Sequence, residues 1–524
     1  MKKLLWLSFL IITSLSCKEY SKADIKSEIK IIPRPSKIAV LNGTFELTNK
    51  TSVKACSDLL LQAEQLRTYL YPASGFILPV NKRIAGGNLI ELKLSDELSS
   101  LGEEGYKLNI TSKKVLISAY KPNGIFCGIQ TLRQMLPDEI LRKAIADNIK
   151  WIIPCVSIVD KPRFSWRGLM IDYSRTFWNK RVTEKYIDAM SYYKLNKLHM
   201  HLTDDQGWRL EINNYPALTK IASKFDTIYH EPGEREGYYS KEDIRELVHY
   251  AAARNVEIIP EIEMPGHTSE IFAAYPQFSC TGDTSIIQPF FKGPGVHNEI
   301  LCAGKEVTFE FLEGVLSEVI ELFPSEYIHI GGDEAPKVAW KACPLCQKRI
   351  KDEVLKDENE LQSWFIKRIE RYLNSKGKKL IGWDEIIEGG LSNTATLMYW
   401  RGSKEDAPLV AVNQGNDIIM SPTSYCYFDY SYEKISIEKV YSFEPLSGKL
   451  ENVDAHHILG VQANFWSHID RTEPNMDRQI FPRILALAEV GWTERENRDW
   501  KDFSVRLNHH YKSINLLDIY SMIP

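Results

Sequence analysis

From about residue 161 onward, short apolar runs rich in β-branched residues alternate with longer stretches of helical spacing. The apolar runs lack a polar face, which is typical of strands buried on both sides. Helical patterns lie between them, for example at 183–195, 241–254, 308–322 and 359–375. The apolar runs are 168–173, 197–202, 256–262, 327–330, 379–383, 396–400, 417–420 and 458–465. Eight of them predict a parallel (β/α)8 TIM barrel over residues 161–524, with an open doubly wound sheet as the alternative.

Residues 31–160 have a different pattern. The stretches 88–94 and 105–119 alternate between apolar and polar residues, which predicts hairpin strands. Helical spacing predicts helices at 59–70 and 123–136. Because no cluster of reactive side chains occurs here, we predict a small α+β support domain that precedes the barrel.

Length and charge agree with this two-domain organisation. The chain has 524 residues, more than one ordinary core accommodates. Charged residues make up 26% and hydrophobic residues 44%, the balance of a soluble globular protein. The net charge is −4 and no long basic run occurs, which argues against a nucleic-acid partner.

The first residues have the pattern of a secretory signal. Two lysines precede an apolar run over 4–12 that is too short to span a bilayer, and small residues then lead to Cys17. This arrangement resembles the cleavage box of bacterial lipoproteins. We predict a signal peptide over 1–16, lipidation of Cys17 and a polar tether over 17–30, with plain signal-peptidase cleavage as the alternative. A lipid anchor would hold the protein in the periplasm or at the outer surface.

Four of the other eight cysteines raise the question of a disulfide or a metal site. Cys280 and Cys302 flank a loop rich in glycine and proline, and in an exported chain they could form a disulfide. Cys343 and Cys346 form a C-x-x-C motif with no second pair nearby and no histidine at zinc spacing. A disulfide or two free thiols are therefore favoured over a metal site, and no metal or cofactor is predicted.

Polar and aromatic side chains gather where six of the predicted strands end. The strand ends read His201-Leu-Thr-Asp204-Asp205, Glu261-Ile-Glu263-Met-Pro-Gly-His267, Tyr327-Ile-His-Ile-Gly-Gly-Asp333-Glu334, Gly382-Trp383-Asp384-Glu385, Tyr399-Trp400 and Ala463-Asn-Phe-Trp466. In a (β/α)8 barrel the carboxyl ends of the strands surround the active site. Paired carboxylates beside tryptophans, with no phosphate-binding glycine loop, indicate glycoside chemistry.

Three tryptophans support a sugar site. Trp383, Trp400 and Trp466 fall at the ends of the fifth, sixth and eighth predicted strands. A single tryptophan is more often a packing residue. Three at equivalent strand ends favour a wall against the C–H faces of a sugar ring.

Five ordered motifs resemble glycoside hydrolase family 20, the β-N-acetylhexosaminidases, from about residue 31 to the C-terminus. The motifs are Arg167-Gly-Leu-Met-Ile-Asp172-Tyr-Ser-Arg175, His201-Leu-Thr-Asp204-Asp205-Gln-Gly-Trp208, Glu263-Met-Pro-Gly-His267, Gly331-Gly-Asp333-Glu334 and Gly382-Trp383-Asp384-Glu385. The resemblance implies an exo-acting enzyme that removes terminal β-linked N-acetylhexosamines from oligosaccharides and glycoconjugates. It also implies substrate-assisted retaining hydrolysis, in which the substrate's 2-acetamido oxygen attacks the anomeric carbon.

The resemblance assigns roles to four residues of the catalytic machinery. Glu334 would be the general acid and then the base, and Asp333 would accept the acetamido N–H. Asp204 and His267 would support the acid through a hydrogen-bond relay, although a histidine after Pro-Gly could also be a satisfied loop residue. Neighbouring residues on a strand point to opposite faces, so Asp333 and Glu334 can act together only if the strand ends before them. The two preceding glycines favour such an end.

The resemblance also assigns the sugar subsite. Arg175 would hold the 3- and 4-hydroxyls with its forked guanidinium. The three tryptophans would wall the acetamido methyl and the ring. Tyr427 would donate to the acetamido oxygen and Asp429 would accept from a sugar hydroxyl, with a buried aromatic strand as the alternative for that stretch.

One position departs from the family. The family usually has a glutamate where this chain has His468, near the 4- or 6-hydroxyl. A protonated histidine would favour an anion where a carboxylate repels one. One hypothesis is that the subsite accepts a modified sugar, such as one sulfated at position 6. The alternative is that a nearby residue takes over the contact.

Two rival functions remain open at this point. One is a glycosidase in which Asp333 or Asp384 acts as a true second carboxylate. The other is a surface lipoprotein that binds glycans with a barrel fold and does not hydrolyse them.

Overall fold

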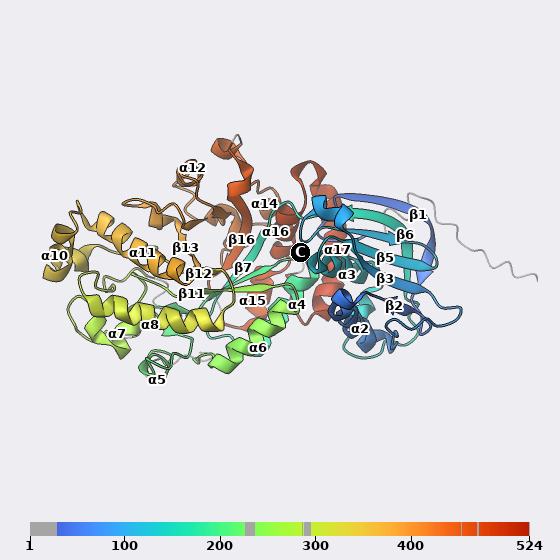
Figure 1. The fold of residues 1–524 in the computed structure, drawn as a ribbon, viewed down its shortest axis with the longest axis horizontal. Helices are drawn as coiled ribbons and strands as arrows, with labels where there is room; N and C mark the ends of the chain where they lie inside the picture. The colour runs from blue at the N-terminus through green and yellow to red at the C-terminus, as the bar shows by residue number, and fades with distance from the viewer. Residues whose placement is uncertain are drawn as a thin grey trace, which may run out of the picture.

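The computed structural model describes residues 29–225, 236–285, 287, 295–451, 453–468 and 471–522. Figure 1 shows these residues as two parts that lie side by side, a β-sheet part formed by the N-terminal residues and a larger barrel part. The predicted signal peptide and the predicted lipidation site, Cys17, lie outside the described residues.

The N-terminal part is a six-stranded sheet with the order β1-β6-β4-β5-β3-β2. The strands are β1 (Lys37–Glu46), β2 (Ser52–Lys54), β3 (Leu89–Leu94), β4 (Tyr106–Ile110), β5 (Lys114–Ala119) and β6 (Ile152–Asp160). Helix α3 (Pro122–Met135) packs on β3, β4 and β5, and α2 (Leu60–Ser74) packs against α3. Both predicted helices of this region are therefore confirmed.

One strand pairing differs from the prediction. β4 and β5 form the expected antiparallel hairpin, but β3 pairs parallel to β5. A 3-10 helix over Asp96–Leu101 separates β3 from β4 and lets the chain return to the far side of β5. Alternation of apolar and polar residues shows which face of a strand is buried, but it does not specify the partner or the direction of pairing.

The second part is a closed barrel in which neighbouring strands are parallel, with the order β7-β8-β11-β12-β13-β14-β15-β16 around the ring. The strands are β7 (Trp166–Asp172), β8 (Lys197–His201), β11 (Glu257–Glu261), β12 (Tyr327–His329), β13 (Lys379–Trp383), β14 (Thr396–Tyr399), β15 (Ile418–Met420) and β16 (Ile458–Phe465). Each corresponds to one predicted apolar run. The predicted (β/α)8 barrel is confirmed, and the open-sheet alternative is wrong.

Helices surround the barrel and elaborate its loops. Around the barrel and towards the C-terminus lie α4 (Lys180–Tyr192), α6 (Lys241–Ala252), α8 (Glu306–Leu322), α11 (Glu358–Ser375), α12 (Ala407–Asn413), α14 (Ile437–Tyr441), α15 (Glu473–Ile480), α16 (Arg483–Trp492) and α17 (Trp500–Leu516). Shorter helices in the loops after strands are α5 (Ala217–Lys220), α7 (Ser269–Ala274), α9 (Val338–Ala342), α10 (Pro344–Asp352) and α13 (Thr423–Cys426). The helices α7, α9 and α10 belong to the loops that follow β11 and β12.

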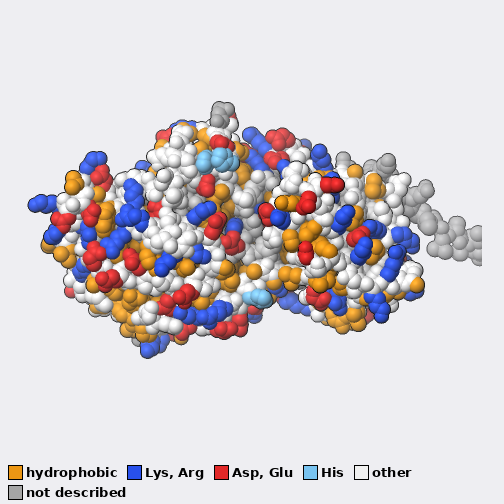
Figure 2. All heavy atoms as spheres, viewed as in Figure 1, with side chains coloured by type: hydrophobic (Ala, Val, Ile, Leu, Met, Phe, Trp, Pro, Cys, Tyr) orange, Lys and Arg blue, Asp and Glu red, His pale blue; other side chains and the backbone are white. Residues whose placement is uncertain are grey.

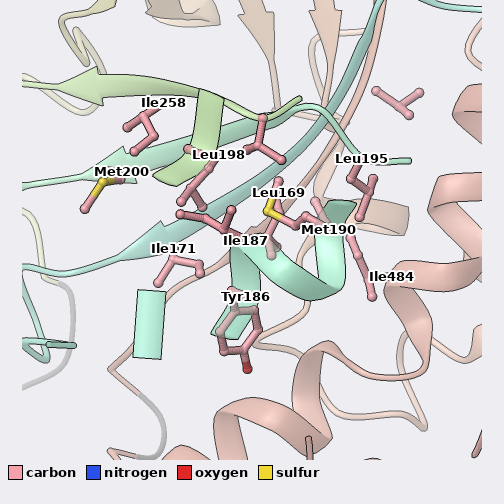
Figure 3. Packing of buried hydrophobic residues seen from close by; sticks show 14 of the residues in the cluster. Leu169, Ile171, Tyr186, Ile187, Met190, Leu195, Leu198, Met200, Ile258 and Ile484 are labelled. Atoms are coloured by element: carbon pink, nitrogen blue, oxygen red, sulfur yellow. The ribbon is translucent and has the colours of Figure 1, made fainter. Parts of the chain in front are cut away.

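The barrel strands bury both faces, and successive residues alternate between them. Figure 3 shows outward-facing Leu169 and Ile171 of β7, and Leu198 of β8, packed near Ile187 and Met190 of α4. A separate buried cluster inside the barrel includes Trp166, Met170, Ile259, Tyr327, Ile381, Trp383, Met398 and Ile419. Two apolar layers on either side of each strand explain why the strands read as continuous apolar runs.

A buried ion pair joins the two parts. Lys194, which follows α4, lies 3.1 Å from Asp160 at the end of β6, and both side chains are fully buried. Asp160 also accepts hydrogen bonds from Tyr106 (2.8 Å) and from the indole of Trp492 (3.0 Å). Because all of these groups are paired, the sheet domain is held against the barrel by a polar network at its centre.

The surface carries no dominant charge on the face shown. Figure 2 shows acidic and basic side chains interspersed over both parts. Among the described residues, no helix combines the length and the apolar character needed to cross a bilayer.

Candidate active site

The acidic pair, Asp333 and Glu334, follows the end of β12. The strand ends at His329, and Gly331 and Gly332 then have φ angles of 67° and 94°, which a side chain rarely permits. Asp333 is buried and Glu334, with a φ of 42°, is exposed. Because the strand ends before the pair, both carboxylates point into the same region.

His267 lies between this acidic pair and a second one. Its Nε2 is 3.4 Å from Glu334 Oε2 and 3.9 Å from Asp333 Oδ2. Its Nδ1 hydrogen bonds to Asp205 Oδ2 at 3.0 Å and lies 3.3 Å from Asp204 Oδ1. The predicted neighbours Asp204 and His267 therefore lie together, but the hydrogen-bonded carboxylate is Asp205, to which sequence reasoning assigned no role.

The charge on His267 follows from these neighbours. Burial disfavours the imidazolium, but the carboxylates of Asp204, Asp205 and Glu334 outweigh burial and hold the pKa of His267 well above 6.5. The histidine is therefore a cation at neutral pH. It can donate from Nδ1 towards Asp204 and Asp205, and from Nε2 towards Glu334.

Arg175 is anchored by Asp204, which also contacts His267. It follows β7, and its Nη2 lies 2.6 Å from Asp204 Oδ2. Its Nη1 is 3.4 Å from Asp172, and its Nε donates to Gln206 Oε1 at 2.7 Å. Arg175 is 3% exposed and all three of its side-chain nitrogens have partners, so the guanidinium is held in one position.

Aromatic rings line the wall between β13 and β16. Trp383 and Trp466 have ring centroids 5.9 Å apart, and Tyr427 lies 6.3 Å from Trp466. Trp400 stacks on Tyr427 at 6.0 Å with an interplanar angle of 20°. Arg175 lies over the Trp466 ring at 5.1 Å. All three predicted tryptophans and Tyr427 thus form one continuous aromatic surface.

Several polar atoms of the pocket are buried without a hydrogen-bond partner. Asp333 Oδ1, Asp429 Oδ1 and His468 Nδ1 have none among the described residues. Buried polar groups are normally paired, so these atoms mark positions where a ligand would hydrogen bond. The predicted residues Asp333, Asp429 and His468 are therefore the ones that a polar substrate could satisfy.

Burial shifts the ionisation of these groups. It raises the pKa of Asp333 to about 6 and that of Asp429 to about 7. Burial, with Asp429 and Asp333, raises the pKa of Tyr427 well above 10, so its phenol stays a hydrogen-bond donor. Burial and then Arg175 lower the pKa of His468 to about 4, so this imidazole is neutral at pH 7.

A buried polar layer beneath the pocket was not predicted. Glu261 accepts from Trp383 Nε1 at 2.8 Å and lies 2.8 Å from His329 Nδ1, 3.0 Å from His199 Nε2 and in hydrogen-bond contact with His201. Glu261 and Asp204 overcome the effect of burial and raise the pKa of His201 to about 10. The signal for this layer was the inward alternation of histidines at 199 and 201.

Glu263 and Gly331 are matched to each other. Glu263 Oε1 accepts the backbone N–H of Gly332 at 3.1 Å, and a Cβ at position 331 would lie 1.7 Å from the same oxygen. Burial, followed by Asp333 and Glu261, raises the pKa of Glu263 well above its usual range, which favours the neutral carboxyl. Glycine at 331 lets this acid support the turn that presents Asp333.

Asp384 is already committed to other partners. Its carboxylate lies 2.7 Å from Arg401 Nε and is fully buried. Glu385, whose pKa burial raises to about 9, accepts from Trp400 Nε1 at 2.8 Å. Asp384 is thus paired with Arg401, and Glu385 holds the indole of Trp400.

The disulfide that Cys280 and Cys302 could have formed is not present, because both cysteines are free in the structure. Their sulfurs instead lie beside those of Cys343 and Cys346. The sequence separation of about 40 residues between the two pairs hid this proximity, since only the barrel brings the loops after β11 and β12 together.

Comparison with known proteins agrees with this geometry. Residues 164–495 match the model of the glycosyl hydrolase family 20 catalytic domain, and residues 28–161 match domain 2 of the same family. The chain belongs to glycosyl hydrolase family 20. The predicted resemblance is confirmed, and the protein is a glycoside hydrolase of the β-N-acetylhexosaminidase type. Family membership supports the hydrolase over a non-hydrolytic glycan-binding protein.

Individual relatives of the family cover nearly the whole chain. A β-hexosaminidase from Porphyromonas gingivalis is 39% identical over 98% of this chain and 67% of its own length. A mutant β-hexosaminidase from Streptomyces plicatus, in complex with the product GlcNAc, is 30% identical with a TM-score of 0.84, covering 95% of this chain and 97% of the other. A β-N-acetylhexosaminidase from Bacteroides fragilis is 32% identical with a TM-score of 0.82, covering 94% and 96%. The names of these relatives support exo-acting hydrolysis by this chain.

Proposed function

We propose that this family 20 enzyme cleaves terminal β-linked GlcNAc or GalNAc by substrate-assisted retention. The substrate's acetamido oxygen attacks C1, the bond to the leaving oxygen breaks, and Glu334 gives that oxygen its proton. The oxazolinium intermediate then opens when Glu334 takes a proton from water, whose oxygen bonds to C1. The supporting observation is that Asp333 Oδ1 is buried without a partner, beside Glu334 and facing the same histidine.

The surroundings of the two acids support different roles for them. Asp333 is buried and ionises with a pKa of about 6, so at neutral pH it is a carboxylate that can accept the acetamido N–H and stabilise the growing positive charge. Glu334 is the more exposed acid, and the His267 cation 3.4 Å away can orient its carboxyl. Tyr427, held as a phenol, is suited to donate to the acetamido oxygen.

The sugar itself would lie against the aromatic wall. Trp383, Trp400 and Trp466 would contact the acetamido methyl and the C–H face of the ring. Arg175 would bind the 3- and 4-hydroxyls, and Asp429 would accept a further hydroxyl. These assignments require no metal and no cofactor in the reaction.

A double-displacement mechanism with an enzyme carboxylate as the nucleophile is the alternative. In that mechanism the acid and the nucleophile lie on opposite faces of the sugar. Asp333 and Glu334 instead approach one imidazole nitrogen, and Asp384 is paired with Arg401. This geometry favours the substrate as the source of the nucleophile.

The decisive experiment varies the nucleophile within the substrate. Aryl β-glucosaminides with N-acetyl, N-fluoroacetyl, N-difluoroacetyl and N-trifluoroacetyl groups share one leaving group, while each fluorine weakens the carbonyl oxygen as a nucleophile. We expect kcat/KM to fall with every fluorine added. Equal rates across the series would overturn substrate assistance while leaving the glycosidase activity intact.

A preference for a 6-sulfated sugar remains a prediction, and the surroundings of His468 argue against it. The charge reversal inferred from sequence needs protonated His468, whereas its pKa of about 4 leaves it neutral at pH 7. We propose instead that His468 hydrogen bonds to a neutral hydroxyl. A His468→Glu variant that loses activity on a 6-sulfated glycoside but not on the plain glycoside would contradict this view.

We also propose export and lipidation, which rest on the sequence alone. The two lysines, the apolar run over 4–12 and the small residues before Cys17 support a lipoprotein signal. Metabolic labelling with a palmitate analogue should label the full chain and should not label Cys17→Ser. Labelling of both forms, or of neither, would contradict lipidation at Cys17.

A further inference from the structure

Four cysteines meet in the loops after β11 and β12. Cys302–Cys346, Cys302–Cys343 and Cys280–Cys346 have Sγ–Sγ distances of 3.6, 3.8 and 3.9 Å. All four sulfurs lie within 4.8 Å of one another. A disulfide needs about 2.05 Å between two sulfurs, so the cluster is neither one disulfide nor two.

The spacing fits a tetrahedral metal site. With a zinc–sulfur bond of about 2.3 Å, the edge between two sulfurs of a regular tetrahedron is about 3.8 Å. Three of the six Sγ–Sγ separations, at 3.6–3.9 Å, match this value, and the other three are no longer than 4.8 Å. A pairwise packing of free thiols has no reason to bring four sulfurs together around one point.

We propose that Cys280, Cys302, Cys343 and Cys346 bind one structural Zn²⁺ ion. Four sulfur ligands in a tetrahedron are the donor set of structural zinc, and they leave no open position for catalysis. In other candidate groups of ligands in the described chain, such as His199, Glu261 and His329, the imidazoles already lie 2.8–3.0 Å from the carboxylate. The cysteine cluster is different because its sulfurs lack such a network of carboxylates and imidazoles.

The protein around the cluster is built to keep it closed. Cys302, Cys343 and Cys346 are buried, and Cys280 is partly exposed. The backbone N–H of Gly304 hydrogen bonds to the Cys302 sulfur, a contact that stabilises a thiolate ligand. A Cβ on Gly304 would lie 2.3 Å from the carbonyl carbon of Leu345, so only glycine lets the two segments approach this closely.

The ion would join two loops that carry the catalytic groups. Cys280 and Cys302 lie in the segment that follows β11 and His267. Cys343 and Cys346 lie at the start of α10, in the segment that follows β12 and the acidic pair. Trp340 Nε1 also donates to Leu301 O at 2.9 Å, which ties the same two segments beside the cluster. Zinc would therefore hold the His267 loop against the Asp333–Glu334 loop.

The first test measures the metal and the thiols of the wild-type full chain, purified without a metal-affinity step. We expect about one zinc per chain by elemental mass spectrometry. Thiol titration after denaturation with a chelator and without reductant should find all four cluster cysteines reactive. Iron in place of zinc, less than about a tenth of a zinc per chain, or cluster cysteines joined in disulfides would each overturn the proposal.

The second test uses matched variants. Cys346→Ser should lose the zinc, whereas Cys155→Ser, which removes an equally buried cysteine far from the cluster, should keep it. If Cys346→Ser does not fold, the test is made on the wild-type protein with Co²⁺ in place of zinc. The cobalt protein should give the visible spectrum of tetrahedral cobalt thiolate. Zinc retained by Cys346→Ser, or an octahedral cobalt spectrum, would contradict the site.

Discussion

His267 Nε2 lies 3.4 Å from Glu334 Oε2, and both residues have a left-handed backbone, with φ angles of 50° and 42°. For residues other than glycine, this left-handed backbone conformation costs about 1–2 kcal/mol. Two such residues in direct contact indicate that backbone strain is accepted at this point to bring the acid and the imidazole together.

Replacing Glu334 by glycine should separate stability from activity. We expect the free energy of unfolding to stay the same or rise by up to about 1 kcal/mol, because glycine relieves the left-handed strain. Hydrolysis of unactivated glycosides should fall by about 10²–10⁴-fold, since the general acid is lost. Chemical denaturation and kcat/KM on a natural disaccharide measure the two effects.

Val354→Gly is the matched control for this variant. Val354 also has a positive φ, of 56°, but it is 87% exposed and outside the site. Its replacement should stabilise the protein and leave kcat/KM unchanged. A Glu334→Gly protein that is destabilised by more than about 1 kcal/mol would show that no strain is stored there.

Gly331→Ala should damage both stability and catalysis. Its Cβ would collide with Glu263 Oε1, so we expect a loss of about 2–5 kcal/mol from overpacking and from the φ of 67° together. Gly377→Ala has a φ of 73° and no heavy atom within 4 Å of the new Cβ, so it should lose only the backbone share, about 1–2 kcal/mol, with full activity. Equal losses from the two variants would be inconsistent with the clash.

Glu263→Gln should be nearly silent. Burial raises the pKa of Glu263, which favours its neutral carboxyl, and an amide oxygen can accept the Gly332 N–H in the same way. We expect unfolding free energies within about 1 kcal/mol of the wild type, whereas Glu263→Ala leaves that N–H unpaired and should lose about 1–3 kcal/mol. If the glutamine variant is as unstable as the alanine variant, the acid is ionised in the native protein.

The pH dependence of kcat/KM should report Asp333. Burial raises the pKa of this carboxyl to about 6, and only the ionised form can accept the acetamido N–H. Below about pH 6, where Asp333 is protonated, kcat/KM should therefore be low, and it should increase as the pH is raised through about 6. Asp333→Asn should remove this limb and lower kcat/KM by about 10²-fold or more at pH 7. An acid limb that persists unchanged in Asp333→Asn would assign it to another group.

The barrel was predictable because each strand is buried on both faces and carries its own signal. The runs at 379–383 and 458–465 match β13 and β16 residue for residue. The position of Glu334 and Trp383 at strand ends followed in the same way. The sequence did not predict which distant strands pair. The parallel pairing of β3 with β5, for example, depends on how the whole chain folds.

The same limit applies to the site. The polar layer around Glu261 and the contact of Asp205 with His267 depend on which side chains the barrel closure brings within 3 Å. The four cysteines illustrate it most clearly, since a C-x-x-C motif read along the chain has no visible partner. Sequence spacing describes neighbours on one element, whereas these contacts join loops from two strands.

The buried pair of Lys194 and Asp160 limits how this enzyme can be recombined with its relatives. A chimera that takes its sheet domain from one parent and its barrel from another would inherit a lone charge at the seam unless both parents carry the same two residues. The workable crossover point is therefore set by the electrostatics of the junction as much as by the boundary between the two folds.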